Sequence, residues 1–246
     1  MIHLAAVLEL QGMKAAEEAL SSLRHDHAYP SKAPEWVTAK GLAALGTEVA
    51  EVAGAVAAGP SPPSVEQLWH HEQLVEAVSS ASDAVPLRYG VRFASSSAAS
   101  SALEAASGTL YEDLAHISSS VELSVRMLVP GRHVRQPSSS GSEVSAATGR
   151  GAAASDAPLP TAADIRRQAS VVHRRLRDAS IAAAPPRLGE GRWALVGAYL
   201  VQRGGTAAFV DLVGRLETPR ARLFCTGPWP PYNFVRGPAT LASLAD

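Results

Sequence analysis

Two short clusters of histidine and carboxylate side chains are the first candidates for chemistry in this chain. The cluster His-His-Glu at residues 70–72 falls on successive positions of an expected helix, where side chains diverge by about 100°. These three groups cannot share one metal ion as a pair at i and i+4 can. The cluster His-Asp-His at residues 25–27 has better geometry in an extended backbone, but no third ligand accompanies it. We interpret the first cluster as a solvated or partly packed helix face and the second as a surface turn, and expect no metal.

Nucleophilic and phosphate-binding motifs are the next candidates. Cys225 is the single cysteine, and the chain contains no G-x-S-x-G elbow and no histidine at a persuasive spacing for nucleophilic catalysis. We interpret Cys225 as the thiol of a buried strand. The Arg-Gly-Gly at residues 203–205 lacks an accompanying G-x-G-x-x-G or Walker pattern, so a turn after a strand is the simpler interpretation. The sequence presents no catalytic constellation, and we expect a protein without enzymatic activity or cofactor.

Arginines within residues 166–177 raise the question of nucleic-acid binding. The chain carries 22 basic and 23 acidic residues, for a formal net charge of −1, so no overall field attracts a polyanion. Sheets that bind nucleic acid display aromatic side chains on their middle strands, and the expected strand at 121–128 has none. A nucleic-acid-binding module is therefore a less favoured alternative, and the arginines fit the solvated side of an amphipathic helix.

Aromatic and proline residues concentrate near the C-terminus, in CTGPWPPYNFVRG at residues 225–237. Trp229, Tyr232 and Phe234 stand there in a chain that is only 5% aromatic. The prolines would suit a PxxP ligand of an SH3- or WW-like domain, but a packed rigid turn is favoured because the segment follows a strand directly. Proline fixes φ and lowers the conformational entropy of the unfolded segment. We expect some of these aromatics, Trp229 foremost, to fill the C-terminal core, and one of the other two to lie at a partner-facing edge.

Periodicity and capping signals predict the elements of the first half. Residues 2–10 fit a strand and, by their Ala and Leu content, also a helix; residues 36–54 fit two short strands around Gly41 or a broken helix, and we favour strands. Ser64 and Gln67 form a capping box. The other expected elements are a helix at 13–25, a helix at about 65–80, a strand with one buried face at 85–93, and one helix whose apolar positions repeat over 99–117.

The second half predicts a different order of elements. An alternating strand at 121–128 is followed by residues 130–159, which are rich in Ser, Gly, Ala and Pro and predict a flexible, low-complexity loop. Thr161 and Asp164 then cap a helix whose apolar stripe comprises Ile165, Ala169, Val172, Leu176 and Ala179. A central strand at 192–202, an amphipathic helix at 206–217 and a last strand at 221–225 complete the series.

The order of these elements predicts an α+β fold of two small domains. We place an N-terminal α+β domain at residues 1–118 and a ferredoxin-like domain, with helices packed on a mostly antiparallel sheet, at 119–246. The single cysteine fits a reducing compartment, the start of the chain lacks the basic region of a signal peptide, and no apolar run approaches the length of a membrane span. We expect a cytoplasmic protein.

Four segments together resemble the F/L family of gas vesicle proteins: HHEQLVEAVSSASDAVPLRYGVRFAS, VELSVRML, GRWALVGAYLVQRGGTAAFVDLVGRLE and CTGPWPPYNFV. The similarity covers roughly residues 41–128 and 160–235. The terminal Gly-Pro-Trp-Pro-Pro-Tyr-x-Phe signature and the VPLRYG element are its most specific parts.

The resemblance implies an accessory protein of gas vesicle formation with two α+β domains. Such a protein is expected to bind the small hydrophobic shell protein and other accessory proteins, to promote nucleation or assembly of the vesicle, and to associate with the vesicle in the cytoplasm. No nucleic acid or membrane partner is implied. A non-enzymatic adaptor of another cytoplasmic complex is the alternative. The two motifs supply the structural and interface candidates Arg88, Tyr89, Trp229, Tyr232 and Phe234.

Overall fold

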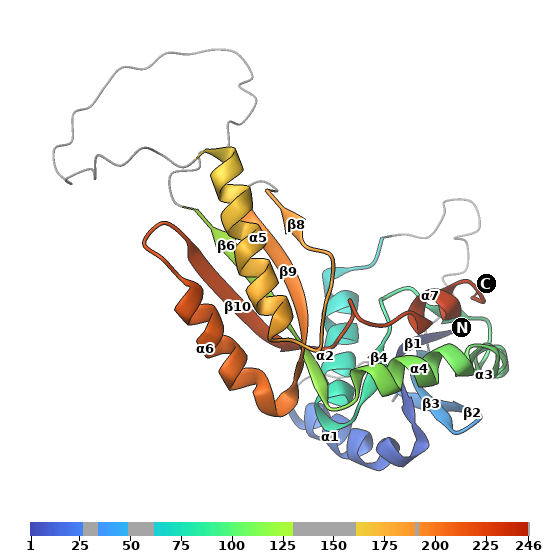
Figure 1. Cartoon of the computed structure of the whole chain (residues 1–246). Coiled ribbons are helices and arrows are strands. Elements are labelled where there is room, and N and C mark those ends of the chain that lie inside the picture. The colour runs from blue at the N-terminus through green and yellow to red at the C-terminus, as the bar shows by residue number, and fades with distance from the viewer. Residues whose placement is uncertain (27–33, 49–61, 130–160, 190–191, 246) are drawn as a thin grey trace, which may run out of the picture.

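The computed structural model describes residues 1–26, 34–48, 62–129, 161–189 and 192–245 of the 246-residue chain. It contains two antiparallel sheets with helices packed against each, and the two sheets lie in different parts of the molecule (Figure 1). The predicted α+β class is confirmed. The loop predicted at 130–159 falls outside these ranges.

The first sheet has the order β2-β3-β1-β4, with β5 also pairing with β1. Its strands are β1 (Ile2–Glu9), β2 (Glu35–Ala39), β3 (Leu42–Glu48), β4 (Ala84–Pro86) and β5 (Arg92–Phe93). A two-residue turn joins β2 to β3, and both of its residues, Lys40 and Gly41, have positive φ. That conformation suits the twist of a hairpin. The pair of strands favoured around Gly41 is therefore confirmed, as is a strand rather than a helix at the N-terminus.

Helices cover both faces of the first sheet. On one face α1 (Met13–Asp26) and α2 (Val65–Ala81) pack against β1 and β3, and on the other lie α3 (Ser96–Ala105) and α4 (Ser107–Ile117). A register shift in β1 lies between Leu4 and Ala6. Strand β1 feeds both cores: Leu4 and Val7 belong to the α3–α4 side, and Ala6 and Leu8 to the α1–α2 side.

Two predicted elements of the first half are each divided in the structure. Residues 85–93 do not form one strand, because a turn at Tyr89 and Gly90, with Gly90 at φ +113°, separates β4 from β5. The apolar positions of 99–117 are buried as expected, but they belong to two helices, since the backbone leaves the helix at Ala106 (φ −86°, ψ −2°). The capping box of Ser64 and Gln67 is confirmed.

The second sheet has the order β10-β6-β9-β7, with β8 also pairing with β9, and α5 and α6 pack on one of its faces (Figure 1). The strands are β6 (Ser120–Leu128), β7 (Ala182–Ala183), β8 (Arg187–Leu188), β9 (Trp193–Gln202) and β10 (Arg222–Trp229); the helices are α5 (Ala162–Asp178) and α6 (Thr206–Leu216). The expected order is confirmed, with β7 and β8 added. The capping box of Thr161 and Asp164 is also confirmed, whereas Ala179 is the exposed C-cap of α5 and not part of its buried stripe.

Short elements complete the fold. The Arg-Gly-Gly at 203–205 forms a 3₁₀ turn between β9 and α6, as expected, and a second 3₁₀ turn spans Leu10–Gly12. After β10 the chain returns to the first sheet, where α7 (Gly237–Ala242) buries Leu241 in the core under α3 and α4. The division into two domains at 118/119 stays a proposal.

Candidate protein-interaction site

The VPLRYG element lies across β1 and is held there by backbone and histidine contacts. The amide of Leu87 donates to the carbonyl of Ala5 at 2.9 Å, and the carbonyl of Leu87 accepts from His71 Nε2 at 2.7 Å. The amide of Gly90 donates to His3 Nε2 at 2.9 Å. Two buried imidazoles thus satisfy backbone groups that the short strands β4 and β5 leave without ladder partners.

The imidazoles and Tyr89 form one compact ring cluster. His3 stacks on His71 with 5.0 Å between ring centroids, and Tyr89 meets them edge-on at 4.4 and 5.5 Å. Burial, together with the charges of His71 and Arg92, lowers the pKa of His3 to about 3, and burial also lowers the pKa of His71. Both rings are neutral at physiological pH. His71 is buried, His70 is half-buried and Glu72 is exposed, so residues 70–72 form the partly packed helix face expected from the sequence.

The PPYNF segment bridges the two sheets through carboxylates. Tyr232 donates its hydroxyl to Glu72 of α2 at 3.3 Å, and Asn233 donates to Glu122 of β6 from its amide at 3.0 Å and from Nδ2 at 2.6 Å. Burial raises the pKa of Glu122, and the bonds from Asn233 oppose that shift. Burial also raises the pKa of Tyr232, and the neighbouring Glu72 adds to the effect.

Arg88 joins the two sequence motifs. Its positive charge lowers the pKa of both Glu122 and Tyr232, which are far from it in sequence. The structure therefore brings together Arg88 and Tyr232, two of the five residues selected from the sequence. Tyr89, the residue after Arg88 in the VPLRYG element, lies in the ring cluster with His3.

The remaining part of the C-terminal segment is fixed to α4. Buried Asp113 accepts the amides of Arg236 at 2.7 Å and Gly237 at 2.6 Å, while the guanidinium of Arg236 contacts Glu112 at 2.7 Å. Phe234 packs against the core between the first sheet and α3–α4, and Tyr232 against the α1–α2 core. Both aromatics thus serve the first sheet, which corrects the expectation that this segment fills the C-terminal core.

Trp229 differs from these two aromatics because its side chain is 46% exposed. It ends β10 after a register shift that begins at Thr226, and its Nε1 donates to Thr226 Oγ1 at 3.3 Å. Gly227 enables this path: its φ is +121°, and a Cβ there would lie 2.8 Å from the carbonyl oxygen of Glu122. The expectation of a buried Trp229 is wrong, since the bulge turns the indole outward.

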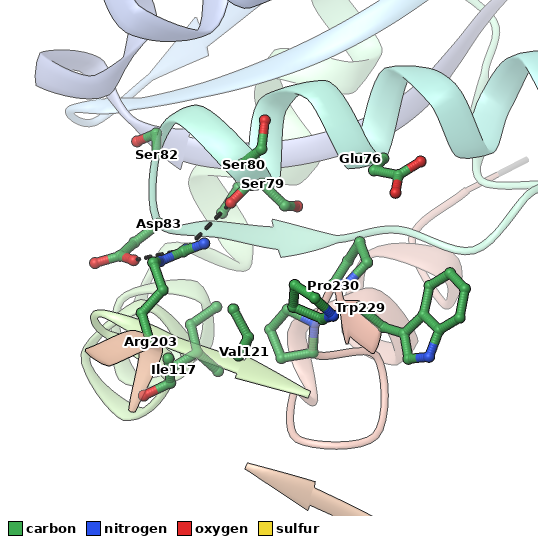
Figure 2. Close-up of a pocket in the computed structure, with 14 residues that line it drawn as sticks. Glu76, Ser79, Ser80, Ser82, Asp83, Ile117, Val121, Arg203, Trp229 and Pro230 are labelled. Carbon is green, nitrogen blue, oxygen red and sulfur yellow. Dashed lines mark hydrogen bonds and ion pairs between the residues drawn. The ribbon is translucent and has the colours of Figure 1, made fainter. Parts of the chain in front are cut away.

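A cleft of about 130 Å³ lies between the end of α2 and the Pro228–Pro231 turn (Figure 2). Arg203 closes one end, where it donates to the carbonyl of Ser79 at 3.2 Å and pairs with Asp83 at 3.8 Å. Trp229 lies at the other end with its indole directed away from Arg203 (Figure 2). The lining mixes apolar and hydroxyl side chains with the charged groups of Glu76, Asp83 and Arg203.

Reactive groups are sparse in the described part of the chain. No three of its His, Cys, Asp or Glu side chains are placed to hold one metal ion. Cys225 lies on β10 as expected, half-buried, and burial raises the pKa of its thiol, which disfavours the nucleophilic thiolate. The histidine cluster at 25–27 extends beyond the described ranges.

Sequence reasoning missed the carboxylates that hold the C-terminal segment, namely Glu72, Asp113 and Glu122. Glu122 had a usable signal, because it is the one acidic residue in a central strand whose other residues, Arg126 apart, are apolar or hydroxyl-bearing. Glu72 was considered only as a metal ligand. Asp113 carried no signal of its own, since an acidic residue within an amphipathic helix usually faces solvent.

Comparisons with known proteins agree with the resemblance based on the sequence motifs. The family model described as "Gas vesicle synthesis protein GvpL/GvpF" matches residues 13–236. Gas vesicle protein L of Streptomyces sp. (strain CB03234) is 40% identical over 68 residues, which are 28% of this chain and 23% of that protein. The aligned stretch thus spans about a quarter of this relative.

Two solved structures have the same fold. GvpF from Anabaena sp. PCC7120 superposes with a TM-score of 0.65 at 13% identity, over 96% of this chain and 95% of that one. GvpF from Microcystis aeruginosa gives a TM-score of 0.62 at 13% identity, over 96% and 98% of the two chains.

Two antiparallel sheets, each packed with helices and bridged by the C-terminal segment, place the protein in the α+β class. The chain belongs to the GvpL/GvpF family of gas vesicle synthesis proteins. The resemblance based on the VPLRYG and GPWPPYNF motifs is confirmed. None of the described helices is long and apolar enough to cross a membrane.

Proposed function

We propose that this protein is a non-enzymatic accessory protein of gas vesicle formation that binds the small hydrophobic shell protein and other accessory proteins in the cytoplasm and promotes nucleation or assembly of the shell. Membership of the GvpL/GvpF family supports a role in gas vesicle formation. The single observation that carries the binding role is the exposed indole of Trp229, fixed on a rigid strand end beside a cleft.

An exposed tryptophan on a rigid platform is a strong candidate for an interface anchor. Aromatic anchors supply much of the energy of protein–protein binding, and a side chain that is already ordered loses little entropy on association. Trp229 meets both conditions, because the bulge at Gly227 and the hydrogen bond to Thr226 orient the ring. The neighbouring Tyr232 and Phe234 hold the segment in place and are committed to the first sheet.

The test compares Trp229→Ala with the wild-type chain in a thermal melt and in a pull-down titration of the shell protein. We expect the melting temperature to stay within a few degrees, since the indole is largely in solvent, and capture to weaken by about tenfold or more, on the order of 1.4 kcal/mol. Trp69→Ala is the matched control, because Trp69 has a similar exposure of 50% at the start of α2.

Two results would contradict the proposal. If Trp229→Ala binds the shell protein as tightly as wild type, this edge is not the contact. If the variant loses stability and binding in proportion, Trp229 acts as a core residue and the exposed-anchor argument is wrong.

A further inference from the structure

One face of the second sheet lies away from α5 and α6. Helices α5 and α6 cover the face formed by Leu123, Val125 and Met127 (Figure 1). The strand register places the alternate residues on the opposite face, and one row across it consists of Phe224, Arg126, Val196 and Arg187. Cross-strand neighbours share a face of the sheet. We call this row, with Arg192 and Trp193 beside it, the Arg–Trp face.

Aromatic rings and guanidinium groups are in direct contact on the Arg–Trp face. Phe224 meets Trp193 edge-on at 5.9 Å, and the guanidiniums of Arg192 and Arg126 lie 4.8 and 5.7 Å from the Trp193 ring centroid. Phe224 is 44% exposed. Neither Arg126 nor Arg192 forms an ion pair with a carboxylate in the described part of the chain. Stacking on tryptophan orients a guanidinium and leaves its N–H groups available to a carboxylate.

Small side chains separate this charged row from Trp229. The next row along the same face contains Thr226, Ser124 and Ala198, and the row after it pairs Trp229 with Glu122. The side chain of Glu122 accepts two hydrogen bonds from Asn233 and forms no ion pair with Arg126 or Arg192 in the described part of the chain. The face therefore presents apolar and small side chains bordered by exposed aromatics, with cationic groups concentrated at one end.

We propose that the Arg–Trp face binds an acidic amphipathic segment of a partner protein, whose apolar side covers Phe224 and the small-residue row and whose carboxylates pair with Arg126 and Arg192. This proposal rests on the proposed function, since it supplies the chemistry of one partner of the accessory protein. Charge complementarity carries it: bidentate guanidinium–carboxylate pairs are among the stronger and more directional polar contacts.

A protein segment fits this face better than a nucleic acid does. A polyanion gains affinity by neutralising many phosphates at once, whereas the chain has a net charge of −1. Arg126 and Arg192, which form no ion pair within the described ranges, sit in an aromatic cluster. A peptide with a few carboxylates can pair with both arginines, and its apolar side chains can pack on the aromatic rings.

The experiment measures fluorescence anisotropy of labelled probes with the full chain at physiological ionic strength. The probes are an amphipathic peptide with leucine on one helical side and glutamate on the other, the same peptide with lysine for glutamate, and a single-stranded DNA oligonucleotide. The variants are Arg126→Glu and Phe224→Ala. Arg174→Glu is the matched control, because Arg174 is exposed on α5, the helix covering the opposite face.

We expect the glutamate peptide to bind, both test variants to weaken that binding by about tenfold, and Arg174→Glu to change it by less than about twofold. Binding of the glutamate peptide that is absent, or equal in Arg126→Glu and Arg174→Glu, overturns the proposal. DNA binding tighter than peptide binding assigns the face to nucleic acid and overturns it too. Capture of the shell protein is measured in parallel for these variants and for Trp229→Ala. If the glutamate peptide does not bind the Arg–Trp face but Trp229→Ala alone loses capture of the shell protein, the proposed role of Trp229 still stands.

Discussion

The buried imidazole of His3 makes the stability of the fold depend on pH. Its side chain is 4% exposed, and its pKa falls from 6.5 in the unfolded chain to about 3 in the folded one. Because the folded-state pKa is lowered, its contribution to stability is complete above pH 6.5 and is lost as the pH falls toward 3. Between about pH 7.5 and pH 5 the linkage gives a loss of about 2 kcal/mol for this one group.

The substitution His3→Gln isolates this contribution. Glutamine keeps an acceptor for the amide of Gly90 but does not titrate, so the variant should lose about 2 kcal/mol less than wild type over the same pH change. The assay is urea unfolding at the two pH values, with His116→Gln as a control at an exposed histidine of α4. Carboxylates present in both chains, Glu122 among them, contribute equally to the two pH profiles, so their contribution cancels in the difference between the chains. Parallel pH profiles for His3→Gln and wild type would refute the argument.

Two further substitutions probe the bridge between the sheets. Glu122→Gln should lower the unfolding free energy by about 1–3 kcal/mol, because its amide group would face the two donors of Asn233; urea unfolding checks this, and an unchanged midpoint would contradict it. Gly227→Ala should cost more than about 1 kcal/mol, since φ is +121° and the carbonyl of Glu122 lies 2.8 Å from the added Cβ. Gly214→Ala, on α6 with no atom within 4 Å of the added Cβ, is its control and should not destabilise.

Most elements could be located from the sequence because the interactions that start or end them join residues close together in the chain. The capping boxes at Ser64 and Thr161 and the turn at Gly41 each involve residues a few positions apart. The divided helix had no such signal. The apolar positions of 99–117 keep one face through the break at Ala106, so their spacing is that of a single helix.

The candidate site was predictable as a set of motifs but not as a geometry. The sequence identified the VPLRYG and PPYNF segments, yet their meeting depends on contacts such as that of Tyr232 with Glu72, 160 residues away. No periodicity encodes which core an aromatic side chain will enter. Trp229, expected in the core, is therefore exposed, whereas Tyr232 and Phe234, one of which was expected at a partner-facing edge, both pack against the cores of the first sheet.

The C-terminal segment acts on both halves of the molecule at once. Glu122 of the second sheet receives Asn233, whereas Glu72 of α2 receives Tyr232, so consecutive residues bind opposite sides of the junction. Asp113 of α4 then fixes the chain three residues further on. The segment thus ties the two sheets together, with Tyr232 and Phe234 packed against the cores of the first sheet and Trp229, at the end of β10, left exposed.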